Sequence, residues 1–189
     1  MDPAADPLDP DLIPRPVVIG GNADAFVDAT WTALHGELFG FLARSTRDPA
    51  AAEDLLQEAF LRLTREVRQG RVPDNVRAWL YRVASNLAIS RGRRATIALR
   101  WISHYGAAEA RSTSVSPETG FLRREQNDAM ERALDRLPPP ARVALVMSGA
   151  GFSGRDIAAA IGRSDIATRT LMSRARITLR RHLAAEEAE

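Results

Sequence analysis

The chain has 189 residues, of which 45% are hydrophobic and 26% charged, so its length and composition allow one globular domain or two small ones. It contains no Cys, which excludes disulfide bonds and thiolate metal sites and fits a reducing compartment. No apolar run approaches the roughly 20 residues that cross a bilayer. The N-terminus lacks the basic and apolar regions of a signal peptide. We therefore expect a cytoplasmic protein without membrane insertion.

The positive charge is concentrated in two zones. The net charge is only +2, and all 26 basic residues are Arg, a preference that genome composition explains equally well. Residues 71–111 hold eight Arg against two acidic residues, and residues 151–183 hold seven Arg against two. Two separated basic zones predict a polyanion that is contacted at two places.

The first half of the chain predicts an irregular arm followed by helices. Residues 1–21 hold five of the eleven prolines and show no helix or strand period, so we expect a disordered or loosely docked arm. Apolar residues at 3–4 spacing predict a first helix over Asn22–Ser45. A second helix is expected from about Pro49 to Arg68, because Asp48 is a suitable N-cap and Pro occupies the first helical position.

The second helix has two faces with different chemistry. A 4, 3, 4 spacing predicts one buried apolar stripe, formed by Leu56, Phe60, Leu63 and Val67. A separate acidic-polar face presents Asp54, Gln57, Glu58 and Leu61. Since burial of the stripe leaves this second face exposed, we expect it to meet a partner.

A third helix is expected from about Val76 to Arg91, after a turn over residues 69–75 in which Asp74 or Asn75 supplies the N-cap. Arg91, Arg93 and Arg94 crowd its C-terminal end, which is more positive charge than a helix C-terminus requires.

Aromatic and amide side chains accompany this basic end. Trp79, Tyr81 and Asn86 supply the stacking and hydrogen-bonding groups that single-stranded nucleic acid needs, next to Arg that can neutralise phosphates. For Trp79 we favour packing in the core. For Asn86 we favour nucleic-acid contact, because Asn has a poor helix propensity and needs another reason to lie in the middle of a helix.

The second half of the chain predicts a separate helical domain. Residues 103–116 are rich in small residues without a period, which indicates a linker between domains over 22–102 and 117–189. A Ser-Pro-Glu start then predicts a helix that runs to Leu137. Three prolines at 138–140 break that helix, and the last of them can open the next one.

The C-terminal segment has the pattern of a helix-turn-helix. A short helix is expected over Gly154–Ile161, capped by Ser153 and ended by Gly162. Ser164 then caps a last, Arg-rich helix that runs to about Leu183. Two helices joined by a tight Gly-containing turn are typical of this motif.

The last helix is expected to enter the major groove of duplex DNA with its N-terminal part. Arg is the commonest reader of guanine edges, and hydroxyl groups can contact bases or phosphates. The predicted contacts are Ser164, Arg169, Thr170, Ser173, Arg174 and Arg176. Several of these Arg could simply solubilise the helix, but we expect at least two to contact DNA.

Nothing in the sequence supports an enzyme. It contains no P-loop, no glycine-rich dinucleotide fingerprint, no HExxH and no Cys/His cluster. The three histidines, His35, His104 and His182, are scattered along the chain. We therefore expect no catalytic residues, no cofactor and no metal.

Four sequence blocks occur in one order: DPAAAEDLLQEAFLRL at 48–63, RAWLYRVASNLAI at 77–89, LPPPAR at 137–142 and GFSGRDIAAAIGRSDIATRTLMSRAR at 151–176. Together they resemble the extracytoplasmic-function (ECF) group of bacterial RNA polymerase sigma factors. The resemblance implies an all-α fold of two small helical domains joined by a flexible linker. It also implies that the first domain binds core RNA polymerase and opens the minus-ten promoter element, and that the second binds the minus-thirty-five element as duplex.

The resemblance assigns roles to residues by position. The polymerase-binding motif falls on Asp54, Gln57 and Glu58, with Leu61 on the same face. Asn86 matches an asparagine that holds a base extruded from the melted strand. The implied minus-ten contacts are Arg71, Asn75, Asn86, Arg91, Arg93 and Arg94. Many members of the group are held inactive by an anti-sigma factor, so one is expected as a partner besides core polymerase and promoter DNA.

Two departures from the family pattern lie in the last helix, where Thr168 replaces an inward apolar residue and Leu171 replaces an Arg that often contacts DNA. Two alternatives to a sigma factor stay open. One is a conventional dimeric helix-turn-helix regulator that binds duplex DNA without polymerase. The other is an interaction module that has lost DNA binding, which Leu171 favours.

Overall fold

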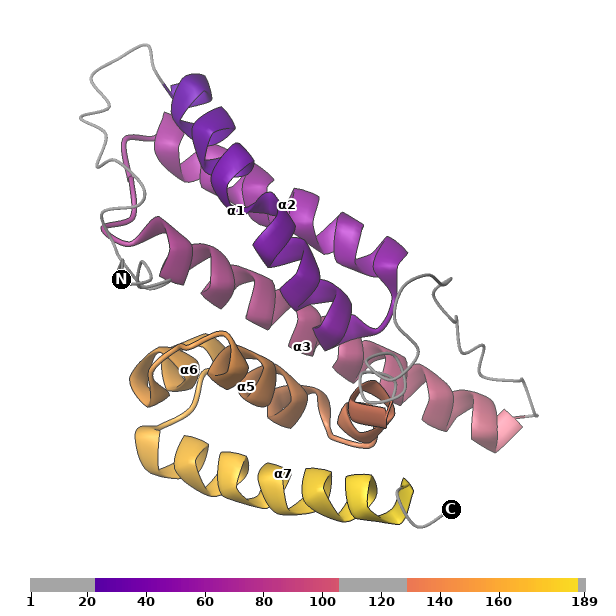
Figure 1. Ribbon diagram of the computed structural model, residues 1–189. Coiled ribbons are helices and arrows are strands. Elements are labelled where there is room, and N and C mark those ends of the chain that lie inside the picture. Colours follow the sequence, from indigo (N-terminus) through magenta and orange to yellow (C-terminus); the bar gives the residue numbers. More distant parts are fainter. Residues whose placement is uncertain (1–22, 106–128, 187–189) are drawn as a thin grey trace, which may run out of the picture.

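The computed structural model describes residues 23–105 and 129–186. Within them every regular element is a helix, which confirms the all-α prediction (Figure 1). The helices are α1 (Ala23–Thr46), α2 (Pro49–Arg68), α3 (Val76–Tyr105), α5 (Pro139–Gly149), α6 (Gly154–Ile161) and α7 (Asp165–Glu186), and residues 129–135 are also helical. None of the described helices is long and apolar enough to span a bilayer. The predicted arm over 1–21, most of the predicted linker and the Ser-Pro-Glu helix start lie outside the described residues.

Local capping sets the helix boundaries that were predicted best. Asp48 accepts a hydrogen bond from the backbone N–H of Ala51 at 3.0 Å, so α2 begins at Pro49 as predicted. At α6, Ser153 and Asp156 form a reciprocal capping box, and Gly162 ends the helix with a φ of 66°. These interactions involve only neighbours in sequence, which is why the sequence alone reveals them.

The predicted end of the third helix near Arg91 is wrong. Helix α3 continues through Gly92 to Tyr105, so residues 103–105 of the predicted linker belong to it. A Cβ on Gly92 would lie 2.7 Å from Cγ and 2.9 Å from Cβ of Pro139 at the start of α5. Gly92 therefore allows a close approach of α5 to α3 and does not terminate α3.

Helix α3 lies between two groups of helices (Figure 1). Helices α1 and α2 pack on one side of it, whereas α5 and α6 pack on the other and separate α3 from α7. Its residues divide into three stripes. Val76, Leu80 and Ala84 are buried toward α1 and α2. A second stripe faces α5 and α6, and it consists of Arg77, Tyr81, Ser85, Ala88 and Gly92.

The third stripe of α3, which we call the outward stripe, contains Asn75, Trp79, Arg82, Asn86 and Arg93. Their spacings of 4, 3, 4 and 7 residues keep them on one side of a helix with 3.6 residues per turn. Asn75, Arg82, Asn86 and Arg93 are exposed, and Trp79 is half-buried. Helix α3 thus packs against α1 and α2 of the first domain and against α5 and α6 of the second domain, and its outward stripe stays accessible.

An aromatic and ionic cluster joins the two groups of helices. The Phe152 ring lies 4.4 Å from the ring of Tyr81, and the Arg77 guanidinium carbon lies 4.7 Å from the centre of the Phe152 ring. Glu37 of α1 pairs with Arg77 and accepts a hydrogen bond from the Tyr81 hydroxyl at 2.7 Å. Burial, with the neighbouring Glu37 adding to it, raises the pKa of Tyr81. Burial alone would raise the pKa of Glu37, but the hydrogen bonds from Arg77 and Tyr81 and the charge of Arg77 outweigh it and lower this pKa.

Arg142 of α5 makes a second contact between the two groups of helices. Its guanidinium donates to the backbone carbonyl of Ser45 in α1 at 3.3 Å. It also donates to the carbonyls of Leu134 at 3.0 Å, Asp135 at 2.9 Å and Leu137 at 3.3 Å. Burial, and then the charge of Arg47, lowers the pKa of Arg142. Because one planar cation donates to carbonyls at the end of α1 and in the segment before α5, it holds these two parts of the chain together.

Candidate functional site

The predicted partner-binding face of α2 is exposed, as expected. Asp54, Gln57 and Leu61 lie opposite the buried stripe, and Leu61 is 53% exposed. Glu58 lies at the edge of this face, where its carboxylate accepts a hydrogen bond from Arg62 at 2.7 Å. A half-exposed leucine between acidic and amide groups can contribute apolar contact to a basic protein surface. The predicted stripe of Leu56, Phe60, Leu63 and Val67 is buried as expected.

The predicted minus-ten residues do not all lie on one surface. Asn86 and Arg93 share the outward stripe of α3 with Asn75, whose side-chain oxygen accepts a hydrogen bond from the N–H of Ala78 at 2.8 Å. This bond confirms Asn75 as the N-cap residue. Arg91 lies about 140° around the helix from Asn86, and it pairs with Asp48 of α2 at 3.0 Å.

Two other predicted contacts are held by neighbours in their own segment. Arg71 forms an ion pair with Glu66, with 2.7 Å between Nε and Oε2, and it also contacts Gln69. The hydrogen bond between these two side chains raises the pKa of Arg71 and lowers the pKa of Glu66. Arg94 is exposed, with its Nε 3.3 Å from the carbonyl oxygen of Ser90. Arg93 and Arg94 therefore retain the accessible charge that a phosphate contact needs.

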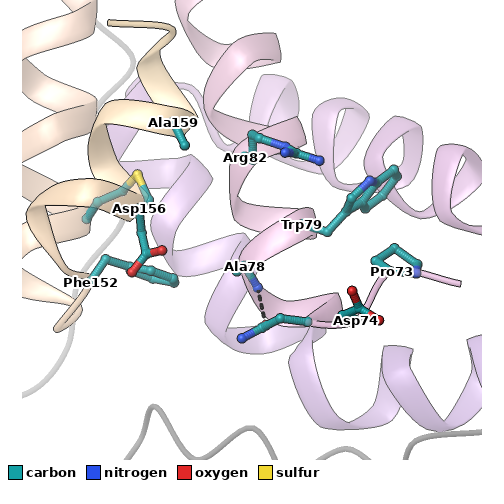
Figure 2. Close-up of a pocket in the computed structure, with 10 residues that line it drawn as sticks. Pro73, Asp74, Ala78, Trp79, Arg82, Phe152, Asp156 and Ala159 are labelled. Atoms are coloured by element: carbon teal, nitrogen blue, oxygen red, sulfur yellow. Dashed lines mark hydrogen bonds between the residues drawn. The ribbon is translucent and has the colours of Figure 1, made fainter. Parts of the chain in front are cut away.

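A hollow of about 330 Å³ lies at one edge of the outward stripe, where α6 approaches α3 (Figure 2). Trp79 and Arg82 face it from α3, and Phe152, Asp156 and Ala159 face it from the other domain. Arg82 is not among the nucleic-acid contacts predicted from the sequence, although its position four residues before Asn86 places it on the same side of α3.

Tyr81 is buried in the core and is not available to stack on a base, in contrast to its interpretation from the sequence. Its side chain is 1% exposed, because it packs between Phe41 and Phe152. The interpretation of Trp79 as a core residue agrees with its packing against the core, although its ring also lines the hollow. Helical periodicity does not predict which of the two side chains is buried, since both are aromatic and lie within one turn of the helix.

The predicted DNA-reading helix presents its polar residues outward. Ser164 accepts a hydrogen bond from the N–H of Ala167 at 3.3 Å and so caps α7 as predicted. The predicted contacts Arg169, Thr170, Ser173, Arg174 and Arg176 are all exposed. Arg176 donates to the hydroxyl of Ser148 in α5 at 3.2 Å, so it lies nearer the domain body than the others do.

The two unusual residues of α7 point inward. Leu171 packs against the core, which explains how an apolar side chain is tolerated where the family often has an Arg. Thr168 is 1% exposed, and its hydroxyl has no hydrogen-bond partner. Its position among apolar residues agrees with the expectation that an apolar side chain normally fills this site.

Comparisons with known proteins agree with this arrangement. Residues 30–97 match the family Sigma-70 region 2, and residues 127–179 match Sigma-70, region 4. The RNA polymerase sigma factor CarQ of Myxococcus xanthus is 36% identical, over 89% of this chain and 95% of that protein. The ECF sigma factor SigM of Mycobacterium tuberculosis is 30% identical, over 87% and 80% of the two chains. A probable sigma factor, RfaY of Xanthomonas campestris, is 32% identical over 80% of this chain, which spans only 39% of that longer relative.

Solved structures share the fold. The sigma factor RpoE of Bartonella quintana, solved in complex with the anti-sigma factor NepR, superposes with a TM-score of 0.67 at 24% identity, over 83% of this chain and 96% of that one. CnrH, solved with the cytosolic domain of CnrY, superposes with a TM-score of 0.57 at 20% identity, over 86% and 90% of the two chains. The two domain matches, the relatives matched over 95% and 80% of their length and the helical fold show that the chain belongs to the ECF group of RNA polymerase sigma factors.

Proposed function

We propose that this chain is an alternative sigma factor that binds core RNA polymerase in the cytoplasm, directs it to specific promoters and assists promoter melting without catalysing a reaction itself. The face of α2 carries this proposal, because Asp54, Gln57 and Leu61 stay exposed opposite a fully apolar stripe. Their exposure has no role in the packing of the described helices, whereas a basic polymerase surface would match it in charge.

DNA is contacted at two places on this proposal. The outward stripe of α3 binds the melted minus-ten element, where Asn86 can hydrogen-bond a base and Arg93 can contact a phosphate. The exposed side of α7 binds the minus-thirty-five element as duplex. The assignment of residues 22–102 to the first function and 117–189 to the second remains a prediction.

The closed arrangement of the two domains has to open for this function. The two promoter elements lie about 25 base pairs apart, or about 85 Å of duplex at 3.4 Å per pair. The 30 residues of α3, the longest described helix, span only about 45 Å. Since α5 and α6 pack directly on α3, the two DNA-binding surfaces cannot reach both elements until that contact separates.

An anti-sigma factor is the proposed inhibitor. The RpoE structure contains a sigma factor in complex with the anti-sigma factor NepR, and the CnrH structure contains the cytosolic domain of CnrY. The support for such a partner in this chain is its fold similarity to those two proteins. The alternative of a conventional dimeric regulator finds no support among these relatives, which are named as sigma factors.

Run-off transcription with core polymerase tests the proposal, on promoters identified by mapping transcripts after overexpression. Asp54→Arg should abolish co-purification with core polymerase and promoter-dependent transcripts, because it places a positive charge against a basic surface. Asp28→Arg makes the same charge change at an exposed position of α1 outside this face and should retain both. Core binding by Asp54→Arg at wild-type affinity would refute the role of this face.

A further inference from the structure

The DNA-facing side of α7 begins with an apolar residue. Ile166 lies in the first turn of the helix and is 75% exposed, the highest value among the large hydrophobic residues of the described chain. Thr170, Ser173 and Ile177 follow it at spacings of 4, 3 and 4 residues and so continue one line along the helix. An isoleucine in this setting gains free energy when another apolar group covers it.

The neighbours of Ile166 leave few polar groups at the start of this line. The Thr170 hydroxyl donates to the carbonyl of Ile166 itself, at 3.1 Å, so its proton is used within the helix. Leu171 is partly buried against the core. Arg169 and Arg174 are exposed on the two flanks of the line. Ile166 is therefore an apolar side chain that follows the exposed Asp165, on a line whose flanks carry Arg169 and, two turns farther on, Arg174.

We propose that Ile166 determines promoter specificity by contacting the C5-methyl group of a thymine in the element that α7 binds. The N-terminal residues of a recognition helix contact base edges. In the major groove the thymine methyl is the apolar group among hydrogen-bonding edges, and apolar side chains are its usual partners. The flanking Arg, within a segment of seven Arg and two acidic residues, hold the phosphates or guanines nearby. This inference rests on the proposed function and refines it.

Replacing each thymine of that element by 2′-deoxyuridine, which removes only the methyl group, tests the inference. The measurement is the Kd of the full-length chain with core polymerase on a promoter found by transcript mapping. For wild type, one replacement should weaken binding about fourfold, the effect of uncovering one methyl group. Ile166→Ala should weaken binding to the thymine promoter by a similar factor. In this variant, deoxyuridine at the thymine that Ile166 contacts should no longer raise the Kd, whereas replacements at the other thymines should act as they do in wild type.

Ile177→Ala is the matched control. Ile177 is 54% exposed, but it lies 11 residues, or about 16 Å, farther along the helix, beyond the N-terminal residues that contact base edges. This variant should keep the wild-type Kd and the wild-type response to deoxyuridine. If Ile166→Ala retains the full penalty at every position, or if no position shows one in wild type, the inference is wrong. If the complex shows no promoter-dependent binding at all, the proposed function itself fails.

Discussion

Gly92→Ala tests the contact between the two domains. An added Cβ would lie 2.7 and 2.9 Å from ring atoms of Pro139, and a proline ring at the first position of α5 cannot rotate away. Overpacking of this kind costs about 1–3 kcal/mol. The gain in helix propensity, up to about 1 kcal/mol, applies equally when the domains are together and apart. Only the steric cost therefore changes their balance, and it should favour the separated form by about 5- to 140-fold.

The separation can be measured directly, because the chain has no Cys of its own. Arg82 and Ala159 are exposed, line the same hollow and belong to different domains. Dyes attached to the double variant Arg82→Cys/Ala159→Cys therefore report the distance across the contact. Gly92→Ala should lengthen this distance and reduce energy transfer between the dyes. The control is Gly36→Ala in α1, where a Cβ would meet no atom within 4 Å. It should leave the distance unchanged and raise Tm by about 2–4 °C.

Two results would contradict the reasoning. One is an unchanged distance in Gly92→Ala, which would mean that α3 and α5 tolerate the extra carbon without moving apart. The other is a rise in Tm equal to that of Gly36→Ala, which would mean that only helix propensity had changed. Either result would show that the approach of Pro139 to Gly92 does not hold the domains together.

Three further substitutions have predictable effects. Thr168→Val should raise the free energy of unfolding by about 1 kcal/mol, because it removes a buried hydroxyl without a partner and keeps the side-chain shape. Glu37→Gln should lower Tm near pH 7. The lowered pKa of Glu37 contributes stability above its ordinary value of 4.5, and this contribution is lost as the pH falls through the folded-state value. Arg142→Met should destabilise the protein by about 2–3 kcal/mol, since it leaves half-buried carbonyls without a donor.

Each of these has a discriminating comparison in thermal or urea unfolding. Thr30 is as buried as Thr168, but its hydroxyl donates to the carbonyl of Phe26 at 2.8 Å, so Thr30→Val should not stabilise. Equal effects at the two threonines would refute the argument. The Tm gap between wild type and Glu37→Gln should begin to shrink as the pH falls below about 4.5, and a constant gap would exclude the Glu37 titration. Arg142→Lys should not restore stability, because a single ammonium cannot reach several carbonyls in one plane; full rescue would contradict this.

Sequence reasoning succeeded where a structure depends on near neighbours. The cap at Asp48, the capping box at Ser153 and the glycine at position 162 all act within one helical turn, so their residue types indicate them. The buried stripe of α2 is also visible, because a helix with one covered side repeats its apolar residues.

It failed where a distant segment determines the outcome. Gly92 resembles a helix terminator until Pro139, 47 residues later, is known to lie against it. Tyr81 has the composition of a nucleic-acid contact, and only the position of Phe152 buries it. Likewise, Arg91 belongs with Arg93 and Arg94 by sequence, yet Asp48 holds it on another side of α3. The family resemblance supplied the candidate residues, but the division of α3 into three stripes needed the structure.

That division bears on how the protein could be kept inactive. The second domain packs on the stripe that contains Arg77, Tyr81 and Ser85, not on the outward stripe. Asn86 and Arg93 consequently stay exposed while the domains are together, and only the end near Trp79 borders α6. On the proposed function, closure does not bury the minus-ten surface. It prevents simultaneous contact with two elements that lie about 85 Å apart. A partner that merely holds the two domains together would therefore inhibit initiation without covering the DNA-binding side of α3.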